Sequence, residues 1–148
     1  MRILVVCAGN TCRSPAAEAA IRRAAAAGGI DVDVSSAGTS AGETGDPPTP
    51  AMVLAGRARG LEISGRATQL TPDRIESADL IIAMDHFSEF FVRSLPRVSA
   101  APIELLGSYD SEPGDDIADP FGRSDEIYAA TLDRIIAAAE ALVSSLSD

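Results

Sequence analysis

The chain has 148 residues, of which 46% are hydrophobic and 23% charged, as is usual for one globular domain with a sizeable core. Its formal net charge of −10 at pH 7 argues against nucleic acid or a membrane surface as a partner. Because no stretch is long enough to span a membrane and Ile3–Val6 is too short for a signal peptide, we expect a single cytoplasmic domain over residues 1–148.

The first half of the chain predicts two strands and two helices. In order these are a strand over Arg2–Val6, a helix over about Ser14–Ala27, a strand over Ile30–Ser36 and a helix over about Thr49–Arg59. The first strand is indicated by a continuous, β-branched apolar run, and the first helix is expected to stop at Gly28-Gly29. Thr49 is the expected N-cap of the second helix, with Pro50 in its first turn.

The second half adds two strands and three helical segments. They are a helical turn opened by Thr71-Pro72-Asp73, a strand in Ala78–Met84, a helix over His86–Ser94, a strand over Ala101–Leu105 and a helix over about Ser124–Ser145. Pro102 suggests that the fourth strand lies at a sheet edge. The buried side of the last helix is expected to hold Ile127, Leu132, Ile135, Ile136 and Leu142. Alternating strands and helices predict an α/β fold, with a parallel sheet and helices on both faces.

The segment between the first strand and the first helix is typical of a phosphate-binding loop. It reads Cys7-Ala8-Gly9-Asn10-Thr11-Cys12-Arg13-Ser14. Backbone N–H groups of a loop that enters a helix converge on one point, where the helix dipole adds positive potential. Gly9 permits close approach, and Asn10 tolerates the left-handed conformation that such a loop needs. The guanidinium of Arg13 can bind two phosphate oxygens at once.

Cys7 lies at the end of the strand, beneath this loop. The loop N–H groups, Arg13 and the hydroxyl of Ser14 would stabilise a thiolate, so we interpret Cys7 as a nucleophile below a bound phosphorus atom. The simpler interpretation, a buried cysteine at a strand end, is disfavoured because strand, glycine, Arg-Ser and helix follow in the right order. A reversible bridge from Cys7 to Cys12 under oxidation is also compatible with their position in one turn.

A thiolate that attacks phosphorus needs an acid to protonate the leaving group, and the acidic loop over residues 107–122 offers candidates. We choose Asp119, because Pro120 fixes the backbone after it. Ala118 and Phe121 suggest an apolar setting in which burial would keep the carboxyl protonated. The other interpretation of Asp119-Pro120, a plain turn, is disfavoured by the phosphate-binding loop. The remaining aspartates of this loop are expected to be solvated: Asp110, Asp115 and Asp116.

His86 is the only histidine in the chain and follows the third predicted strand. A catalytic Cys–His pair is one interpretation. A surface or helix-start role is favoured, because Arg13 and the loop N–H groups already stabilise a thiolate. No Cys/His cluster has the spacing of metal ligands, so neither a metal nor another cofactor is expected.

These motifs resemble the low-molecular-weight protein tyrosine phosphatases over essentially the whole chain. The matching segments are Cys7–Pro15, Ser36-Ala37-Gly38-Thr39, Ala78–Met84 and Asp119-Pro120-Phe121. The resemblance implies a flavodoxin-like phosphatase fold with a four-stranded parallel sheet. It also implies that phosphorylated proteins are the substrates and inorganic phosphate a product.

The resemblance further implies a two-step reaction. Cys7 would take the phosphoryl group as a thiophosphate while Arg13 holds its oxygens. Asp119 would act first as an acid and then as a base for the attacking water. Asn10 and Ser14 would support the loop and the thiolate. Cys12 would form a protective disulfide with the nucleophile.

Within that family the chain looks most like the bacterial protein arginine phosphatases, mainly through Thr11. Tyrosine phosphatases usually carry a bulky apolar residue at that position and aromatic walls that stack on the phenyl ring. Here the loop over residues 39–45 has no aromatic residue, and Phe121 replaces the family's tyrosine. A threonine hydroxyl and the Asp119 carboxylate suit a guanidinium. We therefore predict phosphoarginine as the substrate, with Thr11 and Phe121 setting specificity. The alternative is a tyrosine phosphatase in which Thr11 is neutral.

One position departs from the family pattern. Gly65 stands where a histidine often supports the phosphate-binding loop, so we expect another group or a water to hold Asn10 and Ser14.

Two further interpretations use the same scaffold. An arsenate reductase is disfavoured because no cysteine follows Cys12, and a non-catalytic phospho-binding module is disfavoured because nucleophile and acid are both present.

Overall fold

Within residues 1–42, 44–96 and 100–147, which the computed structural model describes, four parallel strands form one sheet. They are β1 (Arg2–Cys7), β2 (Asp33–Gly38), β3 (Leu80–Ala83) and β4 (Ile103–Leu105). Their order is β2-β1-β3-β4, so β4 lies at an edge, as Pro102 suggested. The predicted α/β fold with a four-stranded parallel sheet is confirmed.

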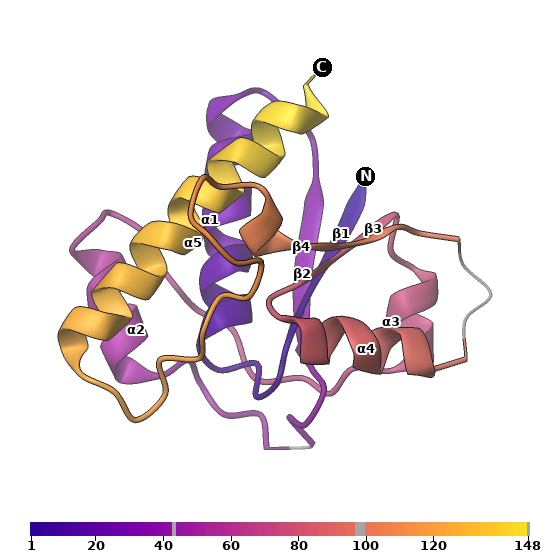
Figure 1. Cartoon of the computed structure of the whole chain (residues 1–148), viewed down its shortest axis with the longest axis horizontal. Coiled ribbons are helices and arrows are strands. Elements are labelled where there is room, and N and C mark those ends of the chain that lie inside the picture. Colours follow the sequence, from indigo (N-terminus) through magenta and orange to yellow (C-terminus); the bar gives the residue numbers. More distant parts are fainter. Residues whose placement is uncertain (43, 97–99, 148) are drawn as a thin grey trace.

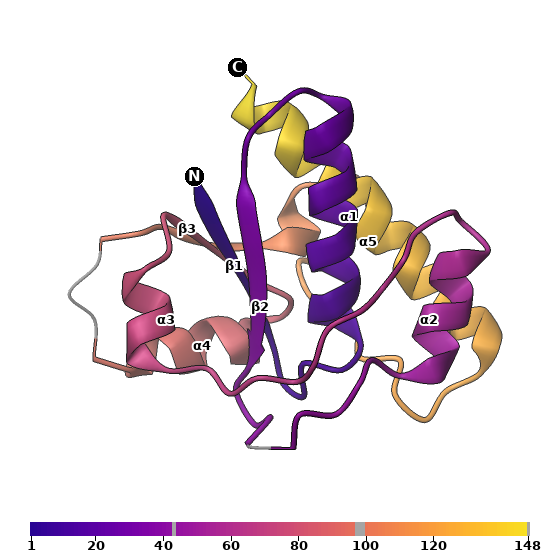
Figure 2. The same cartoon turned by 180° about the vertical axis from the view of Figure 1, so that it is seen from behind.

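Helices cover both faces of this sheet (Figure 1 and Figure 2). Those of the described residues are α1 (Arg13–Ala27), α2 (Pro50–Arg57), α3 (Pro72–Glu76), α4 (His86–Ser94) and α5 (Asp125–Leu146), with a 3₁₀ turn at Leu106–Ser108. In Figure 1, α1, α2 and α5 lie on one side of the sheet and α3 and α4 on the other. None of the helices in the described residues is long and apolar enough to cross a membrane.

The alternation of β1 explains why both faces need covering. Ile3 and Val5 belong to the larger core, which α1 and α5 complete, whereas Leu4 and Val6 belong to a second core that includes side chains of α3 and α4. All four of these side chains are at most 2% exposed. A strand buried on both faces reads as a continuous apolar run, which is the pattern that predicted it.

The carboxyl ends of the strands meet at one edge of the sheet, where ligands bind in open α/β folds. Cys7 at the end of β1 pairs with Gly38 at the end of β2. On the other side, the N–H of Met84 donates to the carbonyl of Val6 at 3.0 Å. The phosphate-binding loop, the start of α4 and the acidic loop therefore leave the sheet side by side.

Two expectations about the elements need correction. The second strand begins at Asp33 rather than Ile30, because Gly29 turns the chain with a φ of +67° and the strand pairs only from Asp33 onward. Ile127 is 38% exposed and is not part of the buried side of α5, where Tyr128 is 4% exposed. Ser124 caps this helix as predicted, since its side chain accepts the N–H of Ile127.

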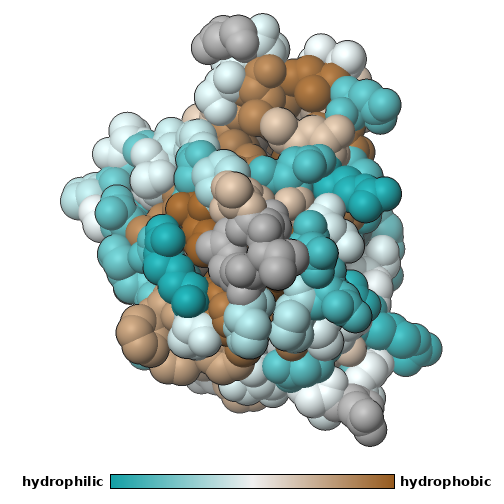
Figure 3. Space-filling model, turned by 90° about the vertical axis from the view of Figure 1, so that its right-hand side faces the viewer, coloured by the Kyte–Doolittle hydropathy of each residue, from teal (hydrophilic) through white to brown (hydrophobic). Residues whose placement is uncertain are grey.

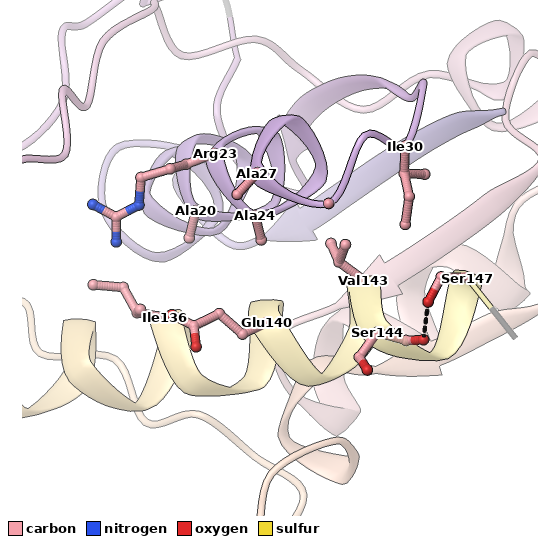
Figure 4. Close-up of a pocket in the computed structure, with 11 residues that line it drawn as sticks. Ala20, Arg23, Ala24, Ala27, Ile30, Ile136, Glu140, Val143, Ser144 and Ser147 are labelled. Carbon is pink, nitrogen blue, oxygen red and sulfur yellow. Dashed lines mark hydrogen bonds between the residues drawn. The ribbon is translucent and has the colours of Figure 1, made fainter.

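A second hollow lies between α1 and α5, away from the carboxyl edge of the sheet. It measures about 600 Å³ and has a mostly apolar lining, with Arg23 and Glu140 among its residues (Figure 4). Residues of the C-terminal half of α1, from Ala20 onward, line this hollow, whereas the phosphate-binding loop lies at the N-terminal end of that helix. In Figure 3 hydrophilic side chains cover much of the face, and apolar surface shows at its upper end and along its left side. The chemistry predicted from the sequence therefore does not belong to this hollow.

Candidate active site

The phosphate-binding loop surrounds the sulfur of Cys7. The backbone N–H of Asn10 donates to Cys7 Sγ at 3.3 Å, and the hydroxyl oxygen of Ser14 lies 2.9 Å from the same sulfur. Asn10 has a φ of +57°, the left-handed conformation predicted for it, and this conformation turns its N–H toward the sulfur. Two donors around a buried sulfur can stabilise a thiolate.

The end of β2 passes directly beneath the loop and fixes it. The N–H of Thr39 donates to the Cys7 carbonyl and that of Ser40 to the Ala8 carbonyl, both at 2.9 Å. A Cβ atom on Gly38 would lie 2.6 Å from the Ala8 carbonyl oxygen, so a glycine is required for this close approach. Gly38 and Thr39 therefore help to fix the backbone conformation of the loop.

The side chain of Asn10 holds the loop from within. Its Nδ2 donates to Ser14 Oγ at 2.7 Å and to Ser36 Oγ at 3.0 Å, and its Oδ1 accepts the backbone N–H of Thr68 at 2.8 Å. Asn10 is only 3% exposed. These contacts answer the question raised by Gly65, because Ser36 and the Thr68 backbone hold Asn10. Neither residue was singled out from the sequence for this role.

Arg13 is 3% exposed and uses one edge of its guanidinium to bind the protein. Its Nη1 donates to Asp85 Oδ2 at 2.7 Å and to the Ile117 carbonyl at 2.8 Å. Its Nε has no hydrogen-bond partner among the described residues, and its Nη2 lies 3.9 Å from Asp119 Oδ2. The Nε–Nη2 edge is therefore the one left to bind two oxygens of an anion.

Charges around Arg13 keep it ionised despite its burial. Burial alone would lower the pKa of Arg13. The hydrogen bond to Asp85 and the negative charges of Cys7, Asp85 and Asp119 outweigh burial and raise it. For Asp85, burial acts to raise the pKa, but hydrogen bonds from Ser88 and Arg13 outweigh it, so the pKa is lowered. The two groups form a charged pair behind the site.

Asp85 is the functional candidate that sequence reasoning missed. Its Oδ1 accepts the N–H of Ser88 at 2.8 Å as the N-cap of α4, and its Oδ2 accepts from Arg13. One carboxylate thus caps a helix and orients the arginine. Its position immediately after the third predicted strand, at the same sheet edge as the loop, was the available signal.

Asp119 lies across the site from the phosphate-binding loop, but its predicted burial is wrong. Its side chain is 50% exposed, because Ala118 and Phe121 are themselves exposed and do not cover it. Phe121 is 70% exposed, and the buried member of the group is Pro120. The Asp119 Oδ1 accepts the N–H of Phe121 at 3.1 Å, a local turn that orients the carboxylate.

The residues predicted for the site converge on one hollow of about 240 Å³. Its lining consists of Cys7, Gly9, Asn10, Thr11, Cys12, Arg13, Asp119 and Phe121. Ser14 supports the sulfur from the helix side, and Ala8 binds the end of β2 through its carbonyl. The hollow can hold a tetrahedral anion between the sulfur and the Asp119 carboxylate.

The two cysteines of the loop differ in their surroundings. Burial, with the negative charges of Asp119 and Cys7, raises the pKa of Cys12 to about 12, so Cys12 is a neutral thiol near pH 7. The Cys7 sulfur is approached by the Asn10 N–H and the Ser14 hydroxyl, so Cys7 is the better nucleophile candidate. Both are free thiols here, and their oxidation to a bridge stays a prediction.

The expectations that His86 and Asp110 are surface residues have different outcomes. His86 starts α4 with its side chain 60% exposed and pairs with Asp116, as expected for a surface residue at a helix start. Asp110 was expected to be solvated, and this is wrong. Its side chain is 5% exposed because it forms an ion pair with Arg134, at 2.9 Å.

Comparisons with known proteins find matches over most of the chain. The family profile described as "Low molecular weight phosphotyrosine protein phosphatase" matches residues 2–148. A "Protein-arginine-phosphatase" of Bacillus subtilis (strain 168) is 37% identical over 91% of this chain and 89% of its own length. The human "Low molecular weight phosphotyrosine protein phosphatase" is also 37% identical, over 85% of this chain and 83% of its own. A solved structure of the YwlE arginine phosphatase, a C7S mutant with a phosphorylated active site serine, superposes with a TM-score of 0.89 at 34% identity, covering 100% of this chain and 97% of that one.

Proposed function

Because the chain belongs to the low molecular weight phosphotyrosine protein phosphatase family, we propose that it dephosphorylates protein side chains through Cys7, with phosphoarginine as its preferred substrate. The observation that carries this proposal is the environment of the Cys7 sulfur. Two donors approach it at 3.3 and 2.9 Å, below a hollow lined by Arg13 and Asp119. The phosphorylated serine in the C7S mutant of the related arginine phosphatase supports a covalent intermediate at this position.

In the first proposed step the Cys7 thiolate attacks phosphorus from below. The S–P bond forms as the bond from phosphorus to the leaving nitrogen or oxygen breaks. Asp119 gives its proton to that atom. The Nε–Nη2 edge of Arg13 binds two phosphoryl oxygens, and the backbone N–H groups of the loop bind the charge that develops on them.

In the second proposed step a water attacks the phosphocysteine. Asp119, now a carboxylate, accepts a proton from the water while the S–P bond breaks and the electron pair returns to sulfur. Inorganic phosphate leaves, and the enzyme is restored with a thiolate at Cys7 and a proton on Asp119. The 50% exposure of the Asp119 side chain gives water direct access to this carboxylate.

The lining of the hollow supports phosphoarginine as the preferred substrate. Thr11 and Asp119 offer a hydroxyl and a carboxylate to a guanidinium, which becomes cationic when it is released. The net charge of −10 favours a positively charged protein segment around the phosphorylated residue. Phosphotyrosine is the second candidate. The exposed ring of Phe121 at the same hollow could contact a phenyl ring. The human phosphotyrosine phosphatase also has the same 37% sequence identity to this chain as the Bacillus subtilis arginine phosphatase.

Matched phosphoarginine and phosphotyrosine peptides test this preference. We expect wild-type protein to have the higher kcat/KM on phosphoarginine. Thr11→Ile should shift the ratio toward phosphotyrosine by about tenfold, because one polar group in a pocket is worth roughly 1–3 kcal/mol. Thr131→Ile on α5, outside the hollow, is the matched control. A wild-type preference for phosphotyrosine that Thr11→Ile leaves unchanged would identify a tyrosine phosphatase.

Asp85→Asn tests the support of Arg13. The amide keeps an oxygen to cap α4 but loses the charge that binds Nη1, so kcat/KM is expected to fall by about 10- to 100-fold, the worth of a hydrogen bond between charged groups. Asp133→Asn, which removes the negative charge of the exposed partner of Arg59, is the control and should change kcat/KM little. Equal activities of the two variants in steady-state assays would show that the charge of Asp85 does not support Arg13.

A further inference from the structure

We infer that Arg134 is a positioning residue that holds the acidic loop so that Asp119 faces the phosphate-binding loop, an inference that rests on the proposed function. Arg134 lies in the third turn of α5, and the loop runs beside this helix after β4 (Figure 1). The residue lines no part of the active-site hollow. Its influence must therefore pass through the loop backbone.

One guanidinium binds both ends of the segment from Asp110 to Asp116. Its Nε donates to Asp110 Oδ2 at 2.9 Å, its Nη2 to the Gly114 carbonyl at 2.5 Å and its Nη1 to the Asp116 carbonyl at 3.0 Å. The side chains of Arg134 and Asp110 are 16% and 5% exposed, so this ion pair is shielded from water. A shielded, multiply bonded guanidinium is far more restrictive than a surface ion pair.

The segment also folds back on the 3₁₀ turn without room for adjustment. A Cβ atom on Gly107 would lie 2.3 Å from the Asp115 carbonyl oxygen and 2.9 Å from Arg134 Nη2. The loop backbone, the turn and the guanidinium are therefore in direct contact. Without Arg134, the excess of carboxylates on this loop would favour its movement toward solvent.

The contact with Asp116 passes directly to the active site. The next residue, Ile117, donates its N–H to the Met84 carbonyl at 2.9 Å, and its carbonyl accepts from Arg13 at 2.8 Å. Asp119 follows two residues later. Because the Asp119 side chain is half exposed, its position is set by this backbone more than by packing around the carboxylate. Arg134 and Arg13 thus bind adjacent carbonyls just before the proposed acid.

A double-mutant cycle separates positioning from a purely structural role. Arg134→Gln and Asp119→Asn are made singly and together, and kcat/KM is measured on the phosphopeptide that the wild-type protein hydrolyses. If Arg134 acts through Asp119, Arg134→Gln lowers kcat/KM about tenfold in the wild-type background, a fraction of the usual worth of a general acid. In the Asp119→Asn background it lowers kcat/KM by less than about twofold, because residues that act as one unit are not additive.

Arg59→Gln is the matched control in both backgrounds. Arg59 also makes two hydrogen bonds to one carboxylate, Asp133, and one to a carbonyl, but it lies away from the acidic loop. We expect it to change kcat/KM by less than about twofold in either background, since exposed ion pairs contribute little. Thermal unfolding of all variants shows whether each one is folded.

Two results would overturn the inference. One is an equal loss from Arg134→Gln with and without Asp119, and the other is no loss at all. Hydrogen exchange gives a readout that does not depend on activity, and Arg134→Gln is expected to speed exchange of the amides in residues 110–119 while leaving α1 protected. If the wild-type protein shows no Cys7-dependent hydrolysis, the proposed function fails, and unchanged exchange in this loop would then separately refute the role of Arg134.

Discussion

Replacing Cys7 by serine is expected to lower kcat/KM by at least about 10⁴-fold, the scale seen when a catalytic nucleophile is removed. A serine hydroxyl in the same place stays protonated near pH 7. The donors of Asn10 and Ser14, at 3.3 and 2.9 Å from the sulfur, then have no negative charge to stabilise. Steady-state kinetics on the hydrolysed phosphopeptide measure the loss. Inorganic phosphate should still bind, because Arg13 and the loop N–H groups are unchanged.

Cys12→Ser is the matched control for that substitution. Both cysteines lie in the same loop and are buried, but the pKa of Cys12 is raised to about 12, so the thiol is neutral and is not a nucleophile near pH 7. We expect Cys12→Ser to lose far less activity than Cys7→Ser. Comparable losses for the two variants would mean that Cys7 does not have a distinct role as the nucleophile.

Arg13→Lys is expected to lower kcat/KM by about 10²- to 10³-fold, the usual worth of a preorganised donor to transition-state charge. The guanidinium of Arg13 binds Asp85 and the Ile117 carbonyl through Nη1 and still presents Nε and Nη2 to an anion. A lysine ammonium has no second edge, so it cannot bind Asp85 and two phosphoryl oxygens at once. Affinity for inorganic phosphate should fall as well.

Arg22→Lys, on the exposed side of the same helix, controls for the chemical change. Arg22 pairs with Glu18 one turn earlier, with its side chain 55% exposed, so its replacement should have little effect on kcat/KM. An Arg13→Lys variant that stays within a few-fold of wild type would contradict the proposed use of the Nε–Nη2 edge. Retained phosphate affinity in that variant would contradict it too.

The sequence predicted the phosphate-binding loop because the loop is local. Strand, glycine, left-handed Asn10 and helix start follow one another within a few residues, and each carries its own conformational preference. The parallel sheet then brings Asp119 to the same edge, because the acidic loop follows the last strand. These features depend on chain order and on residue types that a sequence displays directly.

Features that depend on long-range contacts could not be predicted in the same way. Asp85 meets Arg13 across 72 positions of sequence, and Thr68 meets Asn10 across 58. Nothing in either segment alone marks these pairings. The exposure of Asp119 depends on which side chains cover the acidic loop, and the burial of Asp110 depends on Arg134, which lies 24 residues away in α5. The predictions made from local composition were therefore wrong about the burial of Asp119 and Asp110.

Detection of the phosphoryl group on the enzyme tests the central claim most directly. Wild-type protein and Asp119→Asn are mixed with the phosphopeptide, quenched in acid within milliseconds and digested for mass spectrometry. We predict one phosphoryl group on the peptide that contains Cys7. It should accumulate more in Asp119→Asn, because that variant lacks the base for the attacking water. Turnover without phosphoryl transfer to Cys7, or with the phosphoryl group on another residue, would contradict the account.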